Sequence, residues 1–188
     1  MKTWPRFNND GFGYAKGAEL YWRDKTFWKD FDYTISYSFL DTKRDYLNFP
    51  EELNPDFAAK HTLSIGIKKF FTKRGTGLSL TNSFATGRPY YNFLLNDQQQ
   101  YYVANAGHTA GYETFDASIY HLTKIGKASA IWYVSATNLL GKQNVSGYTY
   151  SFDGQTRQAV MPVARRFYFI GLILNWGVDR RQNAIDNL

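Results

Sequence analysis

The stretch Tyr168-Phe169-Ile170-Gly171-Leu172-Ile173-Leu174-Asn175-Trp176-Gly177-Val178 decides the fold class of this chain. Every second residue from Tyr168 to Val178 is apolar, and the run ends at the charged segment Asp179-Arg180-Arg181. A period of two is typical of a β-strand with one apolar face, and about ten residues are what a tilted strand needs to cross a bilayer. The intervening residues are also largely apolar, so we expect them to pack against something other than water.

Similar alternation recurs upstream. Phe31, Tyr33, Ile35, Tyr37 and Phe39 share one face of a predicted strand, and the residues between them are Asp32, Thr34, Ser36 and Ser38. One face is therefore apolar and the other polar; in a later strand Asn82 interrupts the apolar column. The pattern predicts antiparallel strands at 13–24, 31–46, 61–71, 76–88, 114–122, 128–140 and 164–178.

The composition favours a membrane β-barrel over a soluble β-sandwich. Aromatic residues make up 19% of the chain, yet its mean hydropathy is −0.47. Lipid-facing residues that alternate with wet residues, together with aromatic girdles, produce this combination. No run approaches the ~18 continuous apolar residues of a transmembrane helix.

Short and long connections alternate between the predicted strands. Segments 25–30, 72–75 and 123–127 are short, whereas 47–60, 89–113 and 141–163 are long. Outer-membrane barrels have short periplasmic turns and long extracellular loops, so we expect the chain to end on the periplasmic side. Single-chain bacterial barrels have even strand numbers of eight or more, so seven strands should not close alone.

Several segments resemble the C-terminal barrel portion of TonB-dependent outer-membrane receptors, particularly those of Bacteroidetes-type bacteria. They are Gly13-Tyr14-Ala15-Lys16-Gly17-Ala18-Glu19-Leu20, Ile35-Ser36-Tyr37-Ser38-Phe39-Leu40-Asp41-Thr42-Lys43-Arg44-Asp45-Tyr46, Phe84-Ala85-Thr86-Gly87-Arg88-Pro89-Tyr90-Tyr91, Thr137-Asn138-Leu139-Leu140-Gly141 and Ala164-Arg165-Arg166-Phe167-Tyr168-Phe169-Ile170-Gly171. The likeness extends over nearly the whole chain.

The resemblance implies an all-β fold: an antiparallel transmembrane segment of about seven strands from a 22-stranded barrel in the bacterial outer membrane. Intact family members contain a plug domain and import siderophores, cobalamin or glycans with energy passed through TonB. Residues 1–188 would be a partial barrel domain without a plug or a signal peptide, and so a fragment that does not transport alone. The implied partners are outer-membrane lipid, lipopolysaccharide and the remaining strands and plug, with TonB reached only through the absent plug.

Two other classes of protein stay open. A non-transporting β-sandwich, such as an adhesin or a carbohydrate-binding module, shares the alternation and would be soluble without detergent. A small stand-alone porin would need an eighth strand, for which residues 1–12 are a poor source because they contain Pro5 and Asn8-Asn9-Asp10.

The candidate ligand-binding residues lie at one predicted rim and on one polar column. Arg88, Tyr90 and Tyr91 follow the fourth strand. They are either an ordinary rim turn with interfacial tyrosines or a binding site, in which a guanidinium among rings suits carboxylate, phosphate or sugar recognition. Tyr101 and Tyr102 belong to the long 89–113 loop, which is either a ligand-engaging lid or a mobile surface loop. Glu19, on the first strand, either contacts ligand or plug or is an ordinary paired lumen charge.

A positive belt is predicted at the outer rim. The alternation of short and long connections places these residues on the side of the long loops: Lys43, Arg44, Lys60, Lys142, Arg165 and Arg166. We expect part of this belt to contact lipopolysaccharide phosphates.

Catalytic and nucleic-acid functions find little support. The three histidines lie in separate segments without metal-binding spacing, and neither a Gly-x-Ser-x-Gly elbow nor a phosphate loop followed by a helix occurs. We therefore expect no enzyme, no metal and no cofactor. The net charge of +6 is scattered along the chain without a polybasic run, so nucleic acid is not an expected partner.

Overall fold

The computed structural model describes residues 11–45 and 51–177, and these residues form an all-β structure. Its elements are β1 (Gly13–Asp24), β2 (Phe31–Arg44), β3 (His61–Phe71), the 3₁₀ turn η1 (Thr72–Arg74), β4 (Thr76–Ala85), β5 (Pro89–Leu95), β6 (Tyr101–His108), β7 (Tyr112–Ile125), β8 (Ala128–Thr137), β9 (Gly147–Tyr150), β10 (Arg157–Val160) and β11 (Phe167–Trp176).

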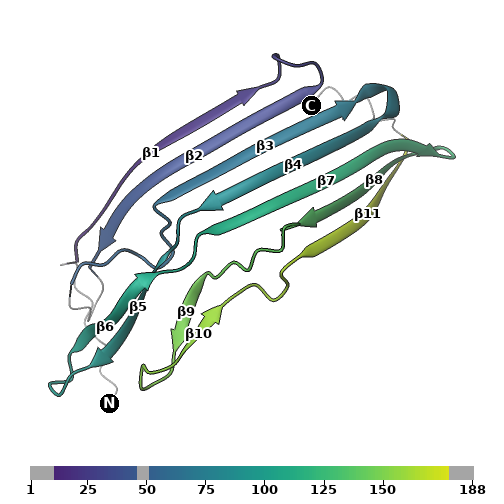
Figure 1. Ribbon diagram of the computed structural model, residues 1–188. Coiled ribbons are helices and arrows are strands. Elements are labelled where there is room, and N and C mark those ends of the chain that lie inside the picture. Colours follow the sequence, from purple (N-terminus) through teal and green to yellow (C-terminus); the bar gives the residue numbers. More distant parts are fainter. Residues whose placement is uncertain (1–10, 46–50, 178–188) are drawn as a thin grey trace.

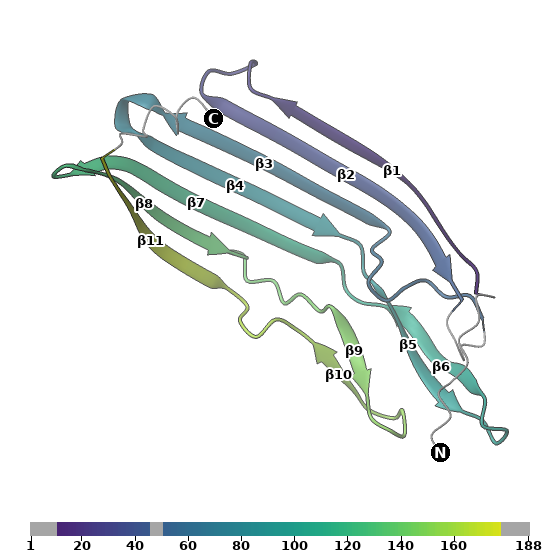
Figure 2. The ribbon, with the colours of Figure 1, turned by 180° about the vertical axis from the view of Figure 1, so that it is seen from behind.

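Seven strands make one antiparallel sheet in the order β1-β2-β3-β4-β7-β8-β11 (Figure 1). The remaining strands form two separate hairpins, β5–β6 and β9–β10, which extend beyond one end of the sheet in both views (Figure 2). We call this the loop end, and the opposite end, with its short connections, the tight-turn end. The predicted antiparallel order of seven strands is confirmed.

The predicted strand bounds for β1 and β3 match the structure, and the others shift at their ends. The strand predicted at 128–140 stops at Thr137 because Asn138 takes a left-handed conformation with φ 50°. The strand predicted at 76–88 stops at Ala85, shortly before Gly87, where a Cβ would lie 1.9 Å from the Thr109 carbonyl oxygen. Only glycine permits this close approach.

Three other strands differ from their predicted ranges. β7 is longer than the predicted 114–122 and leaves a two-residue turn, Gly126-Lys127, whose first residue has φ 60° as a type II′ hairpin requires. β11 begins at Phe167, three residues later than predicted. β2 ends at Arg44, and the predictions for residue 46, residue 178 and the possible strand in residues 1–10 lie outside the described residues.

The interpretation of 89–113 and 141–163 as plain loops was wrong. Each contains a hairpin, β5–β6 in the first and β9–β10 in the second. The turn of the second hairpin includes the dipeptide Asp153-Gly154, which favours hairpin turns. Gly154 has a φ of 68°.

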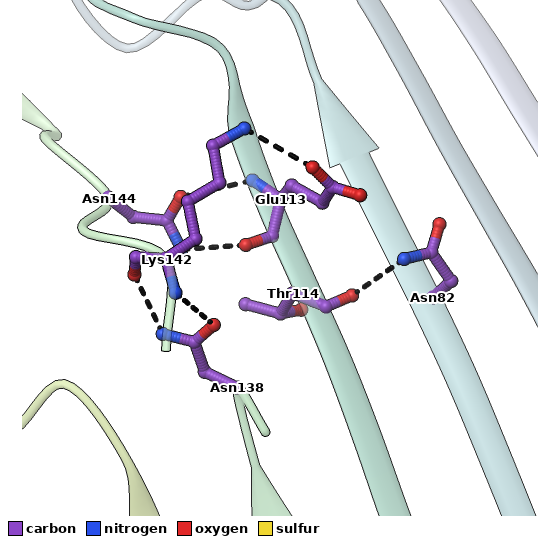
Figure 3. Close-up of polar contacts among 6 residues, drawn as sticks. All are labelled: Asn82, Glu113, Thr114, Asn138, Lys142 and Asn144. Atoms are coloured by element: carbon purple, nitrogen blue, oxygen red, sulfur yellow. Dashed lines mark hydrogen bonds and ion pairs between the residues drawn. The ribbon is translucent and has the colours of Figure 1, made fainter. Parts of the chain in front are cut away.

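The apolar columns of the seven strands coincide on one face of the sheet. Cα pairing links Trp22 to Ile35 and Ile35 to Ile65, and similar links continue to β11. We call this the apolar face; it comprises Ala18, Leu20, Trp22, Tyr33, Ile35, Tyr37, Phe39, Leu63, Ile65, Ile67, Leu78, Leu80, Phe84, Phe115, Ala117, Ile119, Trp132, Val134, Ala136, Tyr168, Ile170, Leu172, Leu174 and Trp176. Asn82 interrupts the apolar face, and its Nδ2 donates to the Thr114 carbonyl (3.2 Å; Figure 3).

The strands are strongly staggered. When the paired residues are followed from strand to strand across the sheet, Asp24, the last residue of β1, leads to Tyr168, the second residue of β11. The starts of β1 and β11 are therefore displaced by about ten residues over six pairings, equivalent to a strand tilt of about 45–50° at ~3.3 Å per residue and ~4.8 Å per strand. Stagger of this kind accompanies tilted strands in barrels.

The apolar face has no covering layer within the described residues. Ile170 is 74% exposed, Trp176 70% and Leu20 60%. The chain exposes 14001 Å², whereas a compact monomer of its 21.8 kDa mass would expose roughly 9,300 Å². Two sheets packed face to face, as in a sandwich, are not found in the described part of the chain.

Candidate functional site

From β1 to β8 the opposite face of the sheet is mainly polar and lined by small hydroxyl side chains, whereas β11 presents the exposed side chains of Phe167, Phe169 and Ile173 there. Besides Glu19, Arg23 and Asp32 this face carries Thr34, Ser36, Ser38, Thr62, Ser64, Gly66, Lys68, Ser79, Thr81, Ser83, Thr114, Asp116, Ser118, Tyr120, Tyr133, Ser135 and Thr137. Arg23 holds the Asp32 carboxylate through two nitrogens, the Nε bond measuring 2.9 Å, and Asp32 is only 7% exposed. Asp32 lines a hollow of about 490 Å³ together with Lys25, Lys68 and Tyr133.

The two hairpins are joined at the loop end by a buried amide. Asn92 of β5 is buried, and its Nδ2 donates to the Gly154 carbonyl in the β9–β10 turn (2.9 Å). Gly154 fits tightly against β5, since a Cβ there would lie 2.7 Å from the Leu94 side chain. The hairpins are thus fixed to each other although they pair with no strand of the large sheet.

Arg157 of β10 forms the second link between the hairpins. Its guanidinium carbon lies 4.4 Å from the centre of the Tyr148 ring and 5.4 Å from that of Tyr90, and its Nη1 donates to the Tyr90 hydroxyl at 2.8 Å. The two rings meet edge to face at 4.8 Å. The hydrogen bond to the Tyr90 hydroxyl raises the pKa of Arg157 above its ordinary value, so its guanidinium is always cationic.

Beside this cluster lies a hollow of about 230 Å³, which we call the loop-end hollow. It is lined by Leu53, Asn54 and Asp56 from the β2–β3 connection, Pro89, Tyr90, Tyr91 and Phe93 from β5, and Ser146, Gly147 and Tyr148 around the start of β9. Carboxylate and amide oxygens, amide and hydroxyl donors and aromatic faces therefore border one small space. Such walls suit a polar ring-shaped group, which can stack on tyrosine and exchange hydrogen bonds.

The structure brings together only part of the predicted ligand-binding set. Tyr90 and Tyr91 line the loop-end hollow, and Arg88 is exposed next to them. Tyr101 and Tyr102 are exposed at the far tip of the β5–β6 hairpin, opposite Leu95 and Leu94. Glu19 is on the polar face of β1, away from the loop-end hollow, and is exposed.

Sequence reasoning missed Tyr148 and Arg157. Both belong to the segment interpreted as a plain loop, although Tyr148-Thr149-Tyr150 alternates and Asp153-Gly154 marks a hairpin turn. These signals would have placed Tyr148 and Arg157 on facing strands. They would not have shown that the hairpin packs against β5.

Buried asparagines organise the rim where β8 leads toward β9 (Figure 3). Asn138 Nδ2 donates to the carbonyls of Lys142 (2.8 Å) and Arg165 (2.7 Å), and Asn138 Oδ1 accepts from the Lys142 amide at 3.2 Å. Asn144 exchanges two hydrogen bonds with the backbone of Glu113, at 2.9 and 3.0 Å. Asn138, from the quoted segment Thr137-Asn138-Leu139-Leu140-Gly141, thus holds the backbone of this rim together.

The six residues of the predicted positive belt all lie at the loop end but do not share one face. Lys43 follows the apolar column of β2, whereas Arg44 points to the other face, where its guanidinium carbon is 5.3 Å from the Phe57 ring centre. Lys60 lies 5.9 Å from the Phe39 ring centre. Lys142 is paired with Glu113 at 3.3 Å, Arg165 donates to Gln143 at 3.4 Å, and the Arg166 guanidinium packs against Gly141.

Within residues 11–45 and 51–177, no group of three or more histidine, cysteine or acidic side chains is placed to hold a metal ion. None of the helices in this part of the chain is long and apolar enough to span a membrane. Comparisons of the chain with protein-family models, with curated proteins and with solved structures found no match.

Proposed function

We propose that this chain forms part of the wall of a transmembrane β-barrel in the bacterial outer membrane. The single observation that supports this most strongly is the apolar face, which extends over all seven strands, is interrupted only by Asn82 in its middle part, and is not covered by any of the described residues. In water such a surface would drive aggregation, because soluble monomers rarely expose apolar patches above a few hundred Å². Against hydrocarbon it needs no further cover, and strand pairing satisfies the backbone except along the outer edges of β1 and β11.

Aromatic side chains gather toward both ends of the apolar face, as membrane interfaces favour. Toward the loop end they include Phe39, Phe84, Phe115 and Tyr168; toward the tight-turn end they include Trp22, Tyr33 and Trp176. Two further aromatic residues of this face, Tyr37 and Trp132, lie near the middle of their strands. Between the two ends lie aliphatic residues such as Ile35, Ile65 and Val134. This order supports a bilayer whose midplane crosses the middle of the sheet.

Within that class, we propose that the chain is the C-terminal barrel segment of a TonB-dependent uptake receptor. The proposal rests on the resemblance of the segments quoted above and on the alternation of short turns with long connections. In the intact receptor, which would import a siderophore, cobalamin or a glycan, the loop-end hollow lies where an incoming ligand first arrives. The segment alone would not transport.

Site-directed spin labelling along β3 tests the membrane proposal. The chain contains no cysteine, so a cysteine placed at each position from Leu63 to Ile67 carries the only label. In lipid bilayers we expect oxygen accessibility to peak at positions 63, 65 and 67 and accessibility to a water-soluble nickel reagent to peak at 64 and 66. Equal accessibility to both reagents along β3, or a chain that is soluble and monomeric without detergent, would instead fit a soluble β module.

The receptor assignment has a separate test. The gene around this chain should encode further amphipathic strands and a plug domain in frame. A gene that encodes neither would contradict the receptor assignment and leave the membrane proposal standing.

A further inference from the structure

Three lysines lie at the loop end of β1, β2 and β3, close to rings or columns of the apolar face. Lys43 is paired with Tyr14, and Lys16 is paired with Asp41 on the same face. Lys16 Nζ lies 4.8 Å from the Tyr14 ring centre, and Lys60 Nζ lies 5.9 Å from that of Phe39. We call Lys16, Lys43 and Lys60 the lysine cluster; all three side chains are exposed.

The lysine cluster carries more charge than its surroundings neutralise. None of the ion pairs among the described residues joins Lys16, Lys43 or Lys60 to a carboxylate. Asp41 and Asp45 are the acidic residues that the register places beside them on this face, Asp45 opposite Phe12, so three ammonium groups face two carboxylates. The cluster therefore keeps a local excess of positive charge next to an apolar wall.

The depth of the lysine cluster matches the edge of a bilayer. At the other end of the same face, Lys69 lies 4.0 Å from the Phe31 ring centre and is paired with Phe31. From Phe31 to Lys43 the strand advances by twelve residues, about 40 Å of chain or roughly 28 Å along the normal at a tilt of about 45°. The hydrocarbon core of a bilayer is about 30 Å thick, so the two lysine levels fall at its two surfaces.

We propose that the lysine cluster binds the phosphorylated headgroup of a lipid in the outer leaflet, with the acyl chains lying along Ile35, Leu63 and Ile65. This inference rests on the proposed membrane function. Ammonium groups form charge-assisted hydrogen bonds with phosphate oxygens, and Tyr14 and Phe39 supply the amphipathic rings that favour this depth. Compared with the positive belt predicted from the sequence, the proposed site adds Lys16 and omits Arg44, because Arg44 faces the other side of the sheet.

Native mass spectrometry of the full chain released from detergent tests the proposal. Lipid A is the probe, compared with its dephosphorylated form and with inorganic phosphate. We expect the triple variant Lys16→Gln, Lys43→Gln, Lys60→Gln to bind lipid A at least tenfold more weakly, and Lys43→Gln alone to lose roughly threefold. The matched control Arg44→Gln removes the same charge one residue away on the other face and should bind as the unaltered chain does.

Three results would overturn the inference: equal lipid A binding by the triple variant, an equal loss in Arg44→Gln, or equal binding of the dephosphorylated lipid. Displacement of lipid A by millimolar inorganic phosphate would also overturn it, because the site would then recognise a free anion. Strand content by circular dichroism checks that the variants fold, and the single variants replace the triple one if it does not. Flotation of the unaltered chain with liposomes tests the membrane proposal separately.

Discussion

At the scale of single residues, buried asparagines hold the loop end together. Asn92, Asn138 and Asn144 are each less than 10% exposed, and each bonds a backbone group of another strand or connection. An amide side chain can donate and accept hydrogen bonds at the same time. It can therefore bond backbone groups in irregular segments, which have no neighbouring strand to pair with. The hairpins and the sheet rim are therefore joined by side chains rather than by strand pairing.

Replacement of Asn92 should loosen the contact between the two hairpins. Asn92→Ala removes the donor to the Gly154 carbonyl and is expected to cost about 1–2 kcal/mol of local opening free energy. Amides of the β9–β10 hairpin should then exchange hydrogen roughly 5–30 times faster. Asn105→Ala is the control, because Asn105 faces Asn92 across the hairpin yet is exposed. Equal exchange in the two variants would contradict the structural role of Asn92.

Asp153 should make the β9–β10 turn sensitive to acid. Its carboxylate accepts from the Ser151 hydroxyl (2.5 Å) and the Gln155 amide (3.1 Å), and these bonds lower its pKa. Because the folded-state pKa lies below the unfolded value of about 3.9, the stabilisation is complete above that pH and is lost as pH falls through the folded-state pKa. NMR of the Gln155 amide should show a midpoint below 3.9, absent in Asp153→Asn. A midpoint at or above 3.9 would contradict this account.

At the scale of elements, alternation made the seven sheet strands predictable. In β1 to β8, the strands of the large sheet have one mainly polar and one apolar face, so their sequences alternate with a period of two, as at Ile35 and Ser36. β11 differs because its second column, with Phe167, Phe169 and Ile173, is also largely apolar. The β9–β10 hairpin was missed because its strands have only four residues each. The strands of the β5–β6 hairpin have seven and eight residues, but neither belongs to the large sheet with its apolar face. The loop-end hollow could not be predicted from the sequence because tertiary packing creates it. Tyr90 and Tyr148 are 58 positions apart, and no local sequence pattern indicates that they meet.

A charge placed on β3 should be tolerated on one face only. Ile65 and Ser64 are neighbours near the middle of β3, Ile65 on the apolar face and Ser64 beside Ser83 on the polar face. In bilayers Ile65→Arg should lower the free energy of unfolding by about 2–4 kcal/mol, as for a cation at the bilayer midplane, and Ser64→Arg by less than about 1 kcal/mol. Denaturant titration of the chain in lipid vesicles measures both. Equal losses would indicate that Ile65 does not face hydrocarbon.

At the scale of the whole molecule, strand direction restricts how the sheet can be completed. With seven antiparallel strands, β1 and β11 both run from the loop end to the tight-turn end (Figures 1 and 2). Joining β1 to β11, within one copy or between equally oriented copies, would create a parallel pair. A closing segment that keeps every pair antiparallel must contribute an odd number of strands, which agrees with the even totals of bacterial barrels.

The two outer strands of the chain alone should therefore remain open. In detergent, hydrogen exchange should be fast at the β1 and β11 amides that point away from β2 and β8, and slow throughout β4 and β7, which have neighbours on both sides. Extension of the chain by an odd number of barrel strands should protect both edges together, because every outward amide then gains a carbonyl partner. Protection of both edges in the unextended chain at every protein concentration would mean that the sheet closes on itself, and protection that appears only on concentration would mean that copies pair edge to edge.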